Sequence, residues 1–152
     1  MNTLEKKYRT LNGWLILVQM FLIIKAFVWI RNVELYLTVV DKKDELLKTI
    51  NVSDTGLYNI FVYFELVMSF LCLFFYIILI YYMFKRSRFF PKLANLFLIS
   101  EILLNFISTF IFIQLQPIEP AIIWNLAVNF VVAVLMIIYL RNSVRVKMTF
   151  VK

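Results

Sequence analysis

The sequence is poor in the residues on which most catalytic and metal sites are built. It contains no histidine and only one cysteine, Cys72, in 152 residues. An internal disulfide, a CxxC redox pair, a bis-histidine haem and the usual zinc sites are therefore excluded. The chain also lacks GxSxG, HExxH and glycine-rich phosphate-loop motifs. We expect no enzymatic activity, no cofactor and no bound metal, and we interpret Cys72 as a small apolar packing residue.

Glycine and charged residues are also scarce. The only glycines are Gly13 and Gly56, which argues against a turn-rich β architecture. Hydrophobic residues make up 63% of the chain, charged residues make up 16%, and the mean hydropathy is +0.87. This composition lies outside the range of ordinary soluble domains. Because helices satisfy their own backbone hydrogen bonds in lipid, it predicts an all-α membrane protein.

Four apolar runs are long enough for a helix to cross a bilayer, which takes about 20 residues. The predicted spans cover residues 11–30, 59–84, 93–115 and 121–140 of a single domain, residues 1–152. Residues 31–58 form the one sizeable loop. Within it, Leu46, Leu47 and Ile50 have the spacing of a short helix on the membrane surface. The sequence therefore predicts a four-helix transmembrane bundle followed by a basic tail, residues 141–152.

Basic residues are distributed unevenly between the two sides of this bundle. Eleven of the sixteen lysines and arginines flank one side, in the N-terminal segment, the loop between the second and third spans, and the tail. The other side carries most of the acidic residues. By the positive-inside rule, the first side and both termini are cytoplasmic. We attribute the net charge of +7 to this topology and to attraction by anionic lipid headgroups, and not to nucleic acid.

Three ionisable residues lie inside the predicted spans, where an unpaired charge is costly: Lys25, Glu65 and Glu101. Measured from the outer ends of the first two spans at about 1.5 Å per residue, Lys25 and Glu65 lie at the same depth. We therefore predict an intramembrane ion pair between Lys25 and Glu65. Glu101 lies deeper and has no acidic or basic residue near it in the sequence.

Polar side chains continue the helix faces of the two glutamates. They recur at helical spacings, and a further i, i+4 pair occurs on the fourth span. With Glu101 they outline an intramembrane polar seam through the bundle. One interpretation is that the seam holds the helices together by hydrogen bonds. The other is a path in which a glutamate loads and unloads a proton as a small molecule moves. The other members of the seam are Ser69, Asn105, Ser108, Thr109, Asn125 and Asn129.

The basic tail has the pattern of a segment at the membrane interface. Apolar residues alternate with cationic or polar residues through its second half. Apolar side chains can then dip into the headgroup boundary while the cations meet anionic lipid. The predicted lipid and interface contacts are Arg141, Arg145, Lys147 and Phe150.

The same tail resembles a known family. Residues 143–150, SVRVKMTF, look like the closing S-x-RVK-x-TF signature of a bacterial family of small four-span proteins, the YdgK-like domain of unknown function. Residues 11–15 resemble its opening L-x-GWL, and residues 89–91 resemble its short basic loop ending in proline. Residues 137–140 depart from its W-x-PY-like segment. The resemblance implies an inner-membrane protein of bacterial type and brings no assigned activity.

These observations predict a multi-pass protein of the bacterial inner membrane that acts as a structural, accessory or interaction protein. Its expected partners are the lipid bilayer, anionic headgroups, and further copies of itself or other membrane proteins. The alternative is a small oligomeric, proton-linked transporter of a small molecule or a lipid. The two interpretations differ in whether the polar seam is closed by its own hydrogen bonds or is open to a moving solute.

Overall fold

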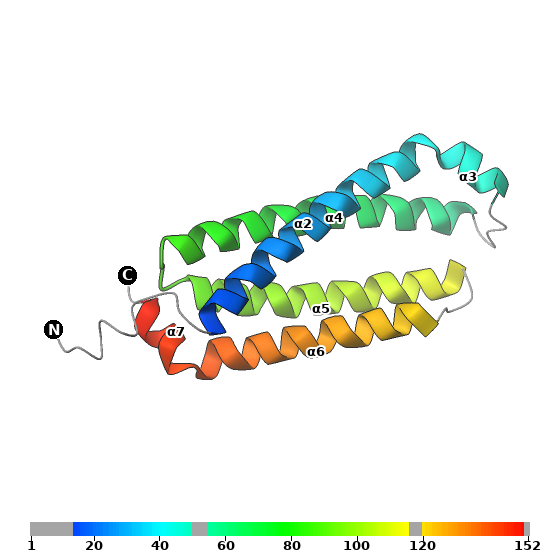
Figure 1. Cartoon of the computed structure of the whole chain (residues 1–152). Helices are drawn as coiled ribbons and strands as arrows, with labels where there is room; N and C mark the ends of the chain where they lie inside the picture. The colour runs from blue at the N-terminus through cyan, green and yellow to red at the C-terminus, as the bar shows by residue number, and fades with distance from the viewer. Residues whose placement is uncertain (1–13, 50–54, 116–119, 151–152) are drawn as a thin grey trace.

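The computed structural model describes residues 14–49, 55–115 and 120–150, and these residues are almost entirely helical. Figure 1 shows four long helices and two short ones, with no strand among the described residues. The long helices are α2 (Trp14–Asp41), α4 (Thr55–Phe84), α5 (Phe90–Leu115) and α6 (Pro120–Asn142). The short helices are α3 (Lys43–Thr49) and α7 (Val144–Thr149).

Each of the four long helices is long and apolar enough to cross a membrane. Their number, length and composition indicate a multi-pass membrane protein, and the predicted all-α, four-helix architecture is confirmed. In lipid, such helices associate through close packing and polar contacts, because hydrocarbon tails are as apolar as the side chains that face them.

The long helices pack in chain order. The contact between α2 and α4 is the most extensive, and α4 packs on α5, which packs on α6. In Figure 1, α2 crosses the bundle obliquely: it starts beside the end of α6 and finishes away from α6, beside the start of α4. The helices α2 and α6 therefore lie farther apart toward the far end of the bundle.

One end of the bundle gathers most of the described cationic side chains, and we call it the basic end. The start of α2, the turn between α4 and α5, and α7 all lie there (Figure 1). The turn contributes Lys85, Arg86 and Arg88, and the C-terminal segment contributes Arg141 and Lys147. Two of the segments that the sequence assigns to one side of the membrane, the α4–α5 turn and the C-terminal segment, thus lie together at this end.

The first long helix extends well beyond its predicted boundary at residue 30. It continues to Asp41, so that the predicted loop over residues 31–58 is in large part helical. The extension is explained by packing, because Val39 and Val40 join a hydrophobic cluster with Phe61 of α4. The short helix predicted in this segment is present as α3, which contains Leu46 and Leu47, whereas Ile50 lies outside the described residues.

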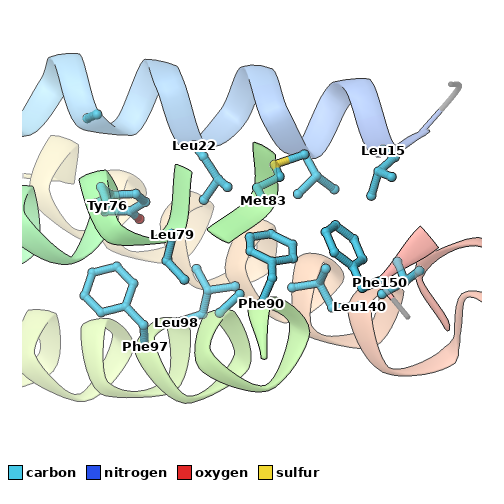
Figure 2. Packing of buried hydrophobic residues seen from close by; sticks show 14 of the residues in the cluster. Leu15, Leu22, Tyr76, Leu79, Met83, Phe90, Phe97, Leu98, Leu140 and Phe150 are labelled. Atoms are coloured by element: carbon cyan, nitrogen blue, oxygen red, sulfur yellow. The ribbon is translucent and has the colours of Figure 1, made fainter. Parts of the chain in front are cut away.

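The main hydrophobic core lies toward the basic end (Figure 2). Leu15 and Leu22 of α2 meet Leu79 and Met83 of α4 in this core. The core also includes Phe90 at the start of α5, Leu140 at the end of α6, and Val146 and Phe150 of the C-terminal segment. The rings of Phe90 and Phe150 are 4.7 Å apart between centroids.

The turn between α4 and α5 ends α4 in a Schellman motif. The backbone N–H of Ser87 donates to the carbonyl of Tyr82, and the N–H of Arg86 donates to the carbonyl of Met83. Arg86 has a φ of 53°. This left-handed conformation is the one that favours glycine at the position after a helix. The turn is therefore formed by backbone hydrogen bonds despite an unfavourable residue type.

Candidate functional site

The charged side chains of the spans lie at two depths, measured as distances along the helices from the basic end. Lys25 is eleven residues after the start of α2, and Glu101 is eleven residues after the start of α5. Both are therefore about 16 Å from the basic end, near the middle of a hydrocarbon layer about 30 Å thick. Glu65 is nineteen residues before the end of α4, about 28 Å from the basic end.

Lys25 and Glu101 form an ion pair in the middle of the bundle. The Nζ atom of Lys25 lies 3.3 Å from Oε1 of Glu101. The Lys25 side chain is 19% exposed and the Glu101 side chain is 6% exposed, so the pair is largely enclosed by protein. A charge at this depth is costly when it stands alone, and each residue supplies the countercharge of the other.

Two further side chains complete this charged network and tie it to the remaining helices. The hydroxyl of Tyr76 on α4 donates to Oε2 of Glu101 over 2.6 Å. Lys25 also donates to Oδ1 of Asn129 on α6 over 3.0 Å. The network of Lys25, Tyr76, Glu101 and Asn129 thus joins one residue from each long helix. Tyr76 is fully buried, and its ring packs edge-on against Phe97.

The predicted ion pair between Lys25 and Glu65 is wrong, because the structure pairs Lys25 with Glu101. The prediction measured depth from the outer ends of the spans and took residue 30 as the end of the first. Since α2 continues to Asp41, that reference point was misplaced. Measured from the basic end, Lys25 is level with Glu101, and Glu65 lies about 12 Å farther along the bundle.

Glu65 belongs to a second polar cluster, nearer the opposite end. The hydroxyl of Ser108 on α5 donates to Oε1 of Glu65. Tyr36, in the part of α2 that sequence reasoning assigned to a loop, is a second hydrogen-bond partner of this carboxyl group. This cluster therefore joins α2, α4 and α5, but it includes no cation among the described residues that contact it.

The other seam residues bond mainly to the backbone of their own helices. Asn105 donates to the carbonyl of Glu101, and Thr109 donates to the carbonyl of Asn105. On α6, Asn129 donates to the carbonyl of Asn125. Side chains at i and i+4 satisfy themselves locally in this way, and Asn129 in addition accepts from Lys25 of α2. Asn105 nevertheless lies close to both glutamates, since it lines the cavities beside each.

A small cavity separates the two polar clusters. Glu65, Glu101 and Ser108 line it together with Trp29, and its volume is about that of one water molecule. The Nε1 atom of Trp29 is buried and makes no hydrogen bond within the described part of the chain. The same is true of the hydroxyl of Ser69, which is fully buried on α4. The predicted seam is thus two bonded clusters with a narrow polar space between them.

The structure offers little to bind a metal. In residues 14–49, 55–115 and 120–150, no three histidine, cysteine, aspartate or glutamate residues are placed to hold an ion. Cys72 is free and buried, as its interpretation as a packing residue requires.

The residues predicted to contact lipid differ in their positions. Arg141 and Lys147 are exposed near the basic end, whereas nothing is described of the Arg145 side chain. Phe150 is only 5% exposed and packs on Phe90, so its assignment to the lipid interface is wrong. The reason is that the tail forms a helix, with the Ser143 side chain accepting from the N–H of Val146. This turn directs Val146 and Phe150 into the protein core.

Sequence reasoning missed two partners of the glutamates. Tyr76 is absent from the predicted polar seam, and Tyr36 falls in the predicted loop over residues 31–58. A tyrosine that is predicted to be buried needs a hydrogen-bond partner for its hydroxyl group, and this requirement is the signal that could have identified Tyr76. No comparable signal identified Tyr36, because its role depends on α2 continuing past residue 30.

Comparison with known proteins places this chain in a family but not beside a characterised relative. The model of a family described as protein of unknown function (DUF2569) matches residues 8–151. No curated protein and no solved structure gives a significant match. The match covers nearly the whole chain, including all four long helices and the network that joins them. The chain therefore belongs to the family of unknown function DUF2569.

Proposed function

We propose that this protein is a structural or accessory component of a bacterial inner membrane, without enzymatic activity, and that it works by associating with another transmembrane helix. The observation that carries the proposal is the network of Lys25, Tyr76, Glu101 and Asn129, which links all four long helices. Each of its charged groups is bonded to a neighbouring helix. Such an arrangement favours a fixed scaffold over a group that is repeatedly loaded and unloaded during transport.

The outer half of α6 supports association as the mode of action. Few residues of α6 are buried in the bundle, and Ile123, Trp124 and Asn125 are exposed. An asparagine side chain exposed on a spanning helix can hydrogen-bond across to a second helix, where lipid offers it no partner. We place the contact with a further copy or another membrane protein on this surface.

The charge distribution supports the proposed location. The basic end carries cations from the α4–α5 turn and from the C-terminal segment, and α3 at the other end carries Asp44 and Glu45. With the basic end on the cytoplasmic side, both termini are cytoplasmic. The YdgK-like designation fits this location, and its closing signature coincides with α7, which is anchored in the core.

Cross-linking from α6 tests the proposal. Cys72 is buried, so a cysteine introduced in place of exposed Ile123 can be the main reactive thiol. In native membranes treated with a permeant cross-linker that joins a maleimide to a photoactivated benzophenone, we expect Ile123→Cys to give a discrete adduct. Adding Asn125→Leu should reduce the yield severalfold. The control is Ile60→Cys, an exposed position on α4 at a comparable distance from the same end of the bundle.

The mass of the adduct identifies the partner. A product of twice the mass of the chain indicates a second copy, and any other discrete mass indicates another membrane protein. The proposal fails if Ile123→Cys gives no adduct, if Ile60→Cys gives the same adduct, or if Asn125→Leu leaves the yield unchanged.

A further inference from the structure

An apolar groove runs between α2 and α6 at the basic end of the bundle. Its volume is about 720 Å³, which lies within the range of pockets that hold small organic ligands. Leu17 and Phe21 line one wall, and Val132 and Leu135 line the other. The groove lies at the opposite end of α6 from the surface assigned above to a partner helix.

The length of the groove matches one leaflet of a bilayer. On α6 it extends from Asn142 back to Val132, ten residues or about 15 Å of helix. The hydrocarbon core is about 30 Å thick, so each leaflet contributes about 15 Å. Phe21 lines both the groove and the pocket that contains Lys25, and the Lys25 ammonium group lies 5.8 Å from the centre of its ring. The apolar surface therefore ends where the charged network begins.

The end of the groove at the membrane surface is polar. Asn142 and Ser143 line it. Arg141 is exposed beside these residues and follows the groove residue Ile138 by three positions, which places it on the same side of α6. Hydrogen-bonding groups and a cation thus lie at the membrane-surface end of a groove whose remaining lining is apolar.

We propose that this groove is a binding site for an anionic phospholipid of the leaflet at the basic end. One acyl chain lies along α2 and α6 as far as Phe21. Asn142 and Ser143 hydrogen-bond to oxygens of the ester and headgroup region, and Arg141 pairs with the phosphate. A partner helix would need an apolar surface through both leaflets, whereas the apolar lining of this groove ends after one, at Phe21 beside Lys25, and that difference favours a lipid as its occupant.

A second groove serves as an internal control. It lies between α5 and α6, and its lining includes Ile107, Phe110 and Leu126. Its volume is about 480 Å³. The only polar group in its lining is Thr109, whose hydroxyl already donates to the carbonyl of Asn105. It therefore offers an apolar surface without groups that could recognise a headgroup.

Retention of lipid by the purified full-length chain tests the proposal. The protein in detergent is incubated with phosphatidylglycerol or with phosphatidylcholine at equal concentrations, and bound lipid is counted by native mass spectrometry. We expect one phosphatidylglycerol to be retained in preference to phosphatidylcholine. Leu135→Trp, which fills the groove, should abolish retention, whereas Ile107→Trp in the control groove should leave it unchanged.

Two milder variants test the polar mouth separately. Asn142→Leu keeps the size of the side chain and should weaken retention about fivefold, the effect of losing one hydrogen bond. Arg141→Gln should reduce the preference for phosphatidylglycerol over phosphatidylcholine. Thermal unfolding of each variant confirms that it remains folded, and Asn142→Leu and Arg141→Gln decide the matter if Leu135→Trp does not fold.

Several outcomes would overturn the proposal. These are equal retention of the two lipids, equal loss in Leu135→Trp and Ile107→Trp, and unchanged retention in Asn142→Leu together with unchanged lipid preference in Arg141→Gln. A wild-type dimer that Leu135→Trp converts to monomer would show that a second copy occupies the groove. The cross-linking result at Ile123 is independent of all of these, because that position lies in the other half of α6.

Discussion

Lys25 donates to Glu101 and Asn129 near the middle of the bundle, where water cannot replace a lost partner. At this depth the cost of removing one member of the pair is set by the charge that remains, and not by the strength of the contact itself. The most informative changes at the residue scale therefore remove one charge or both charges together.

Lys25→Met is expected to destabilise the protein by roughly 3 kcal/mol, because it leaves Glu101 as an unpaired buried carboxylate. Lys25→Met combined with Glu101→Leu should recover much of this loss, since neither charge then remains. The measurement is the free energy of unfolding in mixed micelles, obtained by titration with a denaturing detergent.

The matched control for this pair is Lys25→Met combined with Glu65→Leu. Glu65 is bonded to Ser108 and Tyr36 and not to Lys25, so the two losses should simply add. Recovery of stability in the Lys25→Met, Glu65→Leu variant, together with additive losses in the Lys25→Met, Glu101→Leu variant, would show that Lys25 is paired with Glu65.

At this scale the sequence predicts which side chains need partners but not which partners they find. Lys25, Glu65 and Glu101 stand out because ionisable residues are rare inside spans. The choice between Glu65 and Glu101 depends on a difference of depth of about 12 Å. That difference follows from where α2 ends, and helix ends are the least certain part of a prediction from sequence.

Among the elements, α7 shows how a short basic segment can belong to the core of a membrane protein. It is six residues long, is capped by Ser143, and brings Val146 and Phe150 against the ends of the long helices. Its apolar side chains are therefore enclosed by protein, while Lys147 stays exposed.

Phe150→Ala should lower the stability of the protein by about 3 kcal/mol, the usual cost of truncating a buried phenylalanine. The loss arises from a cavity beside Phe90. Thermal unfolding in detergent measures the effect, with exposed Met148→Ala in the same C-terminal segment as the control. A similar change in unfolding temperature for the two variants would contradict the placement of Phe150 in the core.

Arg86→Gly should stabilise the protein by about 1 kcal/mol. The residue at this position is held at a φ of 53°, which costs a residue with a side chain more than it costs glycine. Arg88→Gly, two positions along in the same turn, is the control for the effect of losing a basic residue. Equal effects of the two changes on the free energy of unfolding would argue against strain at Arg86.

The elements themselves were well predicted because long apolar runs have few structural alternatives. The apolar run in the second half of α4 extends to Phe84, and its predicted end coincides with the end of the helix. The continuation of α2 through Arg31, Glu34 and Asp41 could not be predicted in the same way, because charged residues normally mark the end of a span. The packing of Val39 and Val40 near Phe61 stabilises this continuation, and such a contact is visible only in the folded chain.

Considered as a whole, the molecule is a four-helix bundle with distinct ends. The basic end is closed by the hydrophobic core and by α7, whereas the helices α2 and α6 diverge toward the other end (Figure 1). The composition predicts such an architecture directly. The side of the membrane on which the basic end lies is a prediction from the charge distribution alone.

Cysteine labelling of intact cells measures that orientation. Asp44→Cys on α3 should react with an impermeant maleimide added outside, after passage through any outer membrane. Arg88→Cys in the α4–α5 turn should react only after the inner membrane is opened. Buried Cys72 provides the background in the unmodified protein. The reverse pattern of labelling would invert the proposed topology.

The pairing of Lys25 with Glu101 also constrains the order in which the membrane protein is made. The two residues are separated by 76 positions in the chain, so α2 and α4 leave the ribosome before the countercharge of Lys25 exists. A lysine at the centre of a helix opposes insertion by about 2.5 to 3.5 kcal/mol. During synthesis, α2 must therefore either wait at the insertion machinery or enter lipid with its cation unmatched, and its final position is secured only when α5 arrives.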